Sequence, residues 1–235
     1  MVIPKAIAFF CISYPPMLFA IPQVLTPEEI ADILTVLESA EFIDGKLTAG
    51  WHAKLVKNNQ QLISKTPQAD SLKRQVKKAL NDHPLVQSGI RPKSIHTLLF
   101  SRYDTGMSYG RHTDNALMGG MRSDVSFTLF LNEPDEYEGG ELVIESADAE
   151  QGYKLPAGNV IAYPSTSLHR VNPVTSGMRL VAVGWIQSYI RDPQHREILF
   201  DLEVTRRSLF AQSGKTNEFD LLSKSVANLT RMWSE

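Results

Sequence analysis

Short apolar or alternating runs separated by turn residues occupy residues 95–188, and this pattern constrains the fold more than any other feature of the sequence. Val125, Phe127 and Leu129 alternate with polar Ser126 and Thr128, as in a strand that buries one face. Repeated short strands of this kind are typical of β sandwiches and barrels. Strands are therefore expected over residues 95–103, 124–131, 141–145, 159–163 and 179–188.

Helical patterns lie on both sides of this region. Thr26, Pro27 and Glu29 indicate a helix start, with Thr26 as the N-cap, Pro27 at the first helical position and Glu29 able to complete a capping box. Apolar residues at helical spacing predict another helix over residues 69–81, and further helical stretches are expected after Asp192. The expected fold class is therefore mainly β with flanking helices, an α+β protein.

Charge, cysteine content and hydropathy restrict the partners and the compartment. The 24 Lys and Arg nearly cancel the 26 Asp and Glu, so no nucleic-acid partner is expected. Cys11 is the single cysteine, which excludes an internal disulfide and favours the reducing cytoplasm. Apolar runs such as residues 6–13 are shorter than the roughly 18 residues that span a bilayer, so we expect no membrane association.

A candidate metal site begins with His112 and Asp114. Because they occupy alternate positions, their side chains would lie on one side of an extended segment and could bind one cation. The pair alone is weak evidence, but His169, which follows the expected strand 159–163, supplies a third ligand. Two imidazoles and one carboxylate on one face of a metal leave the opposite positions open, as in non-haem iron(II) oxygenases. Zinc accepts the same donors, so the ligands alone leave the metal open.

Arg179 points to an organic acid as a second ligand. It is expected on a mostly apolar strand face, with Val181, Val183 and Trp185. A guanidinium in such surroundings needs an anion, and it fits a carboxylate through two parallel hydrogen bonds. The alternative is a structural salt bridge to an Asp or Glu of the protein.

Several segments of the sequence resemble a known family. Residues 102–114, RYDTGMSYGRHTD, look like the RYxxGxxYxxHxD signature of the prolyl 4-hydroxylase-like branch of the 2-oxoglutarate oxygenases. HTDNA (residues 112–116), EGGEL (138–142) and WIQS (185–188) resemble more narrowly the bacterial PKHD-type hydroxylases. His169 and Arg179 lie at the spacing that this family uses for its distal iron ligand and for the arginine that binds 2-oxoglutarate.

The resemblance implies a double-stranded β-helix, or jelly-roll, barrel that holds iron(II). His112, Asp114 and His169 would bind the metal, and Arg179 would bind the far carboxylate of 2-oxoglutarate, with Tyr103 as a second donor by family position. Tyr103 could equally be a core tyrosine. The reaction would convert 2-oxoglutarate and dioxygen to succinate and carbon dioxide while hydroxylating an unidentified peptidyl residue or small molecule. L-ascorbate is the expected reductant.

The sequence pattern predicts one main domain with flanking helical segments and suggests a division of the chain. Residues 1–16 would be an N-terminal extension or precede an alternative start at Met17, and residues 17–90 a helical segment packed on the barrel. Residues 91–190 would form the dioxygenase jelly roll and residues 191–235 a C-terminal helical region. These last helices either cover a barrel edge or join two copies into a homo-oligomer, and the sequence leaves both readings open.

Two other function classes are possible for a barrel with these residues. A hydrolase or isomerase with zinc or manganese would have no need for Arg179. A non-catalytic barrel that binds a partner or senses an organic acid would be indicated by a lost ligand, and none of the three is lost. The remaining histidines are expected to be surface or structural residues: His52, His83, His96 and His195.

Overall fold

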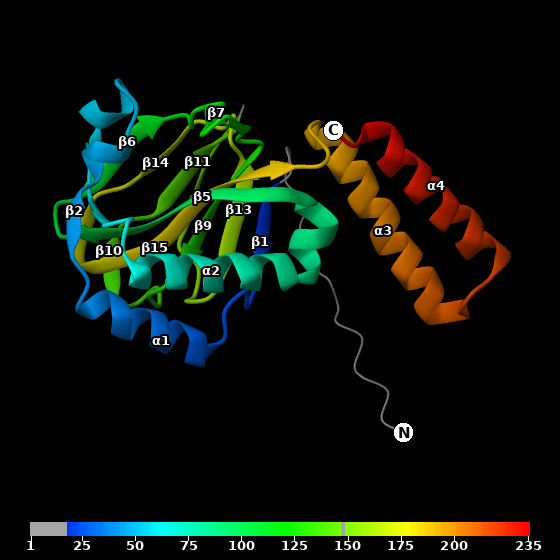
Figure 1. The fold of residues 1–235 in the computed structure, drawn as a ribbon, viewed down its shortest axis with the longest axis horizontal. Helices are drawn as coiled ribbons and strands as arrows, with labels where there is room; N and C mark the ends of the chain where they lie inside the picture. The colour runs from blue at the N-terminus through cyan, green and yellow to red at the C-terminus, as the bar shows by residue number, and fades with distance from the viewer. Residues whose placement is uncertain (1–17, 147–148) are drawn as a thin grey trace.

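Two antiparallel sheets form the core of the computed structural model, which describes residues 18–146 and 149–235 (Figure 1). The larger sheet contains, in spatial order, β1 (Phe19–Ile21), β13 (Val160–Pro164), β9 (Val125–Phe130), β15 (Val174–Ser188), β5 (Pro92–Asp104), β4 (Gln60–Leu62) and β2 (Phe42–Asp44), and β10 (Tyr137–Gly139) pairs with β15. The smaller sheet contains β12 (Glu150–Tyr153), β11 (Leu142–Glu145), β14 (His169–Val171), β6 (Ser108–His112) and β3 (Lys57–Asn58). A separate hairpin joins β7 (Leu117–Met118) to β8 (Met121–Arg122).

Helices flank the sheets, as the expected mainly β, α+β class requires, and this class is confirmed. The helices α1 (Pro27–Glu38) and α2 (Pro67–Asp82) run along one face of the barrel, whereas α3 (Pro193–Ser213) and α4 (Asn217–Trp233) form a hairpin at one end (Figure 1). Short helical turns complete the chain: η1 (Gly45–Thr48), η2 (Ala53–Leu55) and the π-helical η3 (Val86–Ile90). Across the part of the chain that the structure describes, no helix is both long and apolar enough to cross a membrane.

The helix starts follow local hydrogen bonding. At α1 the expected capping box is present, because Thr26 Oγ1 accepts from Glu29 N at 3.2 Å and Glu29 Oε2 accepts from Thr26 N at 2.9 Å. At α3 the N-cap Asp192 accepts hydrogen bonds from the backbone N–H groups of Gln194 and His195. The second helix starts before the expected residue 69, because Thr66 caps it.

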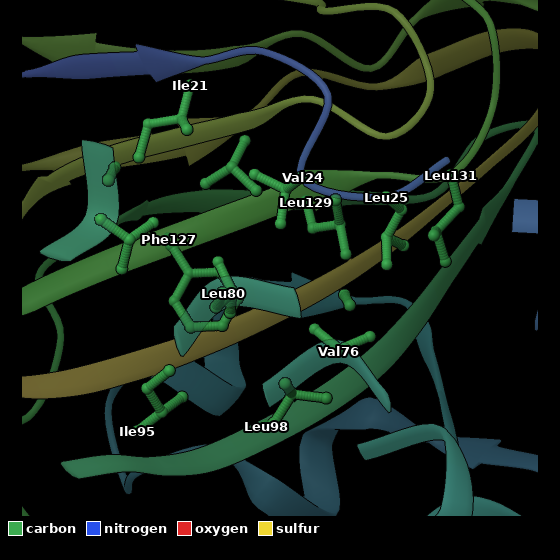
Figure 2. Packing of buried hydrophobic residues seen from close by; sticks show 14 of the residues in the cluster. Ile21, Val24, Leu25, Val76, Leu80, Ile95, Leu98, Phe127, Leu129 and Leu131 are labelled. Atoms are coloured by element: carbon green, nitrogen blue, oxygen red, sulfur yellow. The ribbon is translucent and has the colours of Figure 1, made fainter. Parts of the chain in front are cut away.

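The main apolar core lies between the larger sheet and the helices α1 and α2, and Figure 2 shows the part of it around Val76, Leu80 and Phe127. Val76 and Leu80 of α2 pack there against Leu98 of β5 and against Phe127 and Leu129 of β9. This outer face of the sheet is apolar and buried, so it supplies the area whose burial stabilises the barrel.

The opposite face of the larger sheet is buried, although the sequence predicted that it faces solvent. Ser126 and Thr128 were expected on a solvated face of β9, but both are buried and line an internal cavity. The reason is that the smaller sheet covers this face, and a second cluster that includes Phe130, Val171 and Val181 packs between the sheets. Polar residues on β9 therefore mark the inside of the barrel and not its surface.

The N-terminal segment contains the two expected helices and also contributes strands. β1 extends the larger sheet beside β13, β4 and β2 extend it beside β5, and β3 pairs with β6 in the smaller sheet. The proposed extension at residues 1–16, with Cys11, lies outside the described residues. The division of the chain at residues 17, 91 and 191 remains a prediction.

Removing a side chain from the outer core should destabilise the whole barrel. Leu129 is fully buried between β9 and the helices, so Leu129→Ala should lower the free energy of unfolding by about 2–5 kcal/mol. Urea unfolding measured by circular dichroism checks this value. Leu221→Ala, at a side chain of α4 that is 63% exposed, is the matched control and should change stability by less than about 0.5 kcal/mol.

Candidate metal centre and co-substrate cavity

Two strands of the smaller sheet bring the candidate metal ligands together. His112 ends β6 and His169 begins β14, and the antiparallel pairing of these strands sets the two residues opposite each other. Asp114 lies just beyond the end of β6, with Oδ1 4.0 Å from His112 Nε2 and Oδ2 3.8 Å from His169 Nε2. The three ligand atoms all lie within 4.8 Å of one another, and this is the one such group among the described residues.

Hydrogen bonds orient both imidazoles. His112 Nδ1 lies 2.8 Å from Gly110 O, and His169 Nδ1 lies 3.1 Å from Ser167 O. A carbonyl oxygen only accepts, so each Nδ1 carries the proton and donates it. The lone pair is then on Nε2, the atom that faces Asp114, which is the arrangement expected of a histidine ready to bind a metal.

The surroundings favour the neutral form of the first histidine. The ring of Tyr109 stacks on His112 with centroids 3.7 Å apart, and the ring of Tyr163 meets His169 edge-on at 5.1 Å. Burial, followed by the neighbouring His169, lowers the pKa of His112 to about 4. At neutral pH this imidazole is therefore uncharged, as a metal ligand must be.

A serine pair holds the carboxylate. Ser126 Oγ donates to Asp114 Oδ2 at 2.6 Å, and Ser165 Oγ lies 2.8 Å from Ser126 Oγ. Both serines are buried, so the hydrogen bonds are shielded from competing water. Sequence analysis missed this support, because Ser126 looked like an outward-facing strand residue.

Arg179 lies inside the barrel on β15, opposite Tyr103 of β5. Its Cζ is 5.0 Å from the centroid of the Tyr103 ring and 5.6 Å from that of Phe130, and the side chain is 1% exposed. Among the described residues no carboxylate lies within 4.0 Å of its guanidinium, and its Nε has no hydrogen-bond partner. The alternative of a protein salt bridge therefore finds no partner there, and the buried cation lacks an anion.

The glycines of EGGEL shape the space around this arginine. Gly139 and Gly140 both have positive φ, as the expected turn requires. A Cβ atom on Gly140 would lie 3.1 Å from Arg179 Cδ and 3.2 Å from Tyr137 Cε2. The turn therefore also leaves room for the arginine stem, a role that the sequence did not indicate.

One cavity of about 390 Å³ joins the metal ligands to the arginine. The charged side chains that line it are Lys57, Asp114 and Arg179. Tyr103 lines it as well and is almost fully buried, so this residue is both a core tyrosine and part of the cavity wall. Burial raises the pKa of Tyr103, which keeps its phenol protonated and able to donate a hydrogen bond.

The other histidines lie away from this cluster. His96 Nε2 is 3.0 Å from Arg122 O, and His83 Nε2 is 3.2 Å from Pro22 O. His195 stacks on Trp233 at the base of the α3–α4 hairpin, with ring centroids 4.0 Å apart. These three histidines therefore contact backbone carbonyls or an aromatic ring and do not belong to the metal-ligand cluster.

Comparison with known proteins places the chain in a family. A model of the 2OG-Fe(II) oxygenase superfamily matches residues 98–187. A PKHD-type hydroxylase from Picosynechococcus sp. is 74% identical over 219 residues, which are 93% of this chain and 100% of that protein. The chain belongs to the PKHD-type hydroxylase family. The resemblance found in the sequence is thus confirmed, and this member of the family is an iron(II)- and 2-oxoglutarate-dependent dioxygenase.

Solved structures show the fold of this PKHD-type hydroxylase family member. A prolyl hydroxylase from Trichoplax adhaerens, in complex with a peptide fragment of hypoxia inducible factor, has a TM-score of 0.57 at 15% identity, over 78% of this chain and 87% of that one. A prolyl-4-hydroxylase from Pseudomonas putida has a TM-score of 0.50 at 20% identity, over 73% and 92%. These similarities confirm the jelly-roll barrel.

Loss of the serine that holds Asp114 should weaken metal binding without removing a ligand atom. Ser126→Ala deletes the 2.6 Å hydrogen bond to Asp114 Oδ2, and we expect the affinity for iron(II) to fall roughly 10- to 100-fold. Anaerobic calorimetric titration with iron(II) measures the change. Ser176→Ala, at an exposed position of β15, is the control; equal affinity in the two variants would contradict the role of Ser126.

Proposed function

We propose that His112, Asp114 and His169 hold iron(II), and that Arg179 binds the distal carboxylate of 2-oxoglutarate with Tyr103 as a second donor. The observation that supports this most is a buried arginine without a protein carboxylate in the same cavity as the three ligands. A dicarboxylic 2-oxo acid fits both ends of the cavity. Its distal carboxylate matches the guanidinium, and its oxo acid end would bind the metal.

Each protein group has a defined task in this proposal. When bound, iron(II) supplies the redox chemistry by which dioxygen oxidises 2-oxoglutarate to succinate and carbon dioxide and hydroxylates a C–H bond of the substrate. The Nδ1 hydrogen bonds orient the imidazoles, Ser126 fixes the carboxylate of Asp114, and the sheets exclude water from Arg179. The protein therefore contributes binding, orientation and shielding.

A zinc- or manganese-dependent hydrolase is the alternative that the same ligands left open in the sequence, and membership of the hydroxylase family excludes it. It accounts for His112, Asp114 and His169, but it assigns no task to Arg179. The cost of burying an unpaired guanidinium therefore favours the oxygenase.

Finer features of the function remain predictions. The substrate is a peptidyl residue or a small molecule, and L-ascorbate is the expected reductant. We expect the enzyme in the cytoplasm, and we expect α3 and α4 to join two copies if the chain forms a homo-oligomer; size-exclusion chromatography of a chain shortened before α3 tests that contact.

Replacing any one of the three ligands should nearly abolish turnover. The expected loss in His112→Ala, Asp114→Ala or His169→Ala is at least about 100-fold, because each variant lacks a metal ligand. The assay is anaerobic loading with iron(II), addition of 2-oxoglutarate while following the visible charge-transfer absorption, and then admission of oxygen with quantification of succinate. His83→Ala is the control, since His83 lies away from the cavity. Normal succinate formation by a ligand variant would overturn the metal assignment.

Replacing the arginine should act on co-substrate binding. Arg179→Ala leaves the distal carboxylate of 2-oxoglutarate without its charged partner, which costs about 2 kcal/mol or more and so weakens binding roughly 30-fold or more. Calorimetry with the iron-loaded, oxygen-free protein gives the dissociation constant. Arg74→Ala, on the exposed face of α2, is the control. Equal 2-oxoglutarate affinity in both variants would remove the proposed role of Arg179.

A further inference from the structure

A buried lysine shares the cavity with the metal ligands and the arginine. Lys57 lies on β3 opposite Tyr109 of β6, and the residue is only 5% exposed. Its Nζ is 5.1 Å from the centroid of the Tyr109 ring, and that ring in turn stacks on His112. The ammonium group is therefore directed into the barrel and toward the metal centre.

The neighbours of Lys57 satisfy only part of its hydrogen-bonding capacity. Nζ donates to Thr48 Oγ1 at 3.1 Å, whereas an ammonium group carries three donors. No carboxylate of the described residues lies within 4.0 Å of it. Burial lowers the pKa of Lys57 to about 8, while Asp114 and Asp44 oppose this effect from a distance, so the amine remains mainly protonated at neutral pH.

If iron(II) and 2-oxoglutarate bind as in the proposed function, on which this inference rests, the positive charges in the cavity exceed the negative charges by one. Iron(II) and Arg179 together balance the 2-oxoglutarate dianion and Asp114. Lys57 then adds a positive charge for which the cavity offers no partner, since no further charged side chain lines it. A buried charge of this kind is costly until an anion joins it.

We propose that Lys57 determines substrate specificity by binding an anionic group, most simply a carboxylate, of the molecule that is hydroxylated. Arg179 lies on β15 of the larger sheet and Lys57 on β3 of the smaller sheet, and both line the same cavity, so the proposal assigns a different anion to each cation. The co-substrate uses the first and the substrate uses the second.

Neutral polar groups extend the surface around Lys57. Thr48 also hydrogen-bonds Gln61 Oε1, and Gln61 Nε2 donates to Ser101 Oγ at 3.3 Å. All three side chains line the cavity. This connected wall holds Thr48 in place beside the lysine, so the ammonium group is fixed before an anion arrives.

Matched pairs of neutral and anionic probes test the proposal. The probes are hexanoate with hexanamide and benzoate with benzamide, titrated calorimetrically into the oxygen-free protein loaded with iron(II) and saturated with 2-oxoglutarate. For at least one pair, the wild-type protein should bind the carboxylate about tenfold more tightly than the amide, because one charge-assisted hydrogen bond is gained. In Lys57→Gln this preference should fall to within about twofold.

Controls separate this idea from a structural role and from the proposed function. Lys54→Gln removes the same charge from an exposed position of η2 and should keep the preference for the carboxylate. Lys57→Met keeps the apolar stem against Tyr109 and replaces Lys57→Gln if thermal melting shows that the latter is unfolded. Metal and 2-oxoglutarate affinities, measured on the same samples, report separately on His112, Asp114, His169 and Arg179.

The opposite results would overturn the role of Lys57. A wild-type protein without a preference in either pair, or a preference that persists in the folded Lys57 variant, means that this lysine does not receive a substrate anion. A tenfold loss of 2-oxoglutarate affinity in Lys57→Gln would assign the lysine to the co-substrate instead.

Discussion

The register between paired strands is the constraint on which the site depends. Pairing of β14 with β6 sets His169 opposite His112, and pairing of β15 with β5 sets Arg179 opposite Tyr103. Side chains alternate between the two faces of a strand, so a shift by one residue would turn Arg179 out of the cavity and into the apolar layer beneath α2. The long pairing of β15 (Val174–Ser188) with β5 and β9 makes such a shift costly.

Stability and function are separated by the two faces of the larger sheet. The face toward α1 and α2 is apolar and closely packed, whereas the face toward the smaller sheet carries polar and charged groups around a cavity. Because the outer layer supplies most of the apolar burial, the inner layer can keep Arg179 and Lys57 without protein carboxylates close by. In the proposed function, the charge of each buried cation is neutralised by a bound anion instead of a protein carboxylate.

Much of this organisation follows from the sequence. Alternation predicted β9 and β15, capping residues predicted α1, and the spacing of His112, Asp114 and His169 identified the cluster that the fold assembles. Short strands such as β3 and β14 carry too few residues to show a period, so tertiary pairing alone decides them. Lys57 escaped notice for the same reason: nothing local distinguishes a lysine that a two-residue strand turns inward from one on the surface.

Both metal-facing histidines are oriented by a main-chain carbonyl two residues earlier in the chain, that of Gly110 for His112 and that of Ser167 for His169. Every amino acid supplies a carbonyl oxygen, so no particular side chain has to be retained for this task. Divergent descendants of such a protein are therefore free to rebuild the substrate-facing wall of the barrel, and to change what they hydroxylate, while the imidazoles keep their aim as long as the backbone path survives.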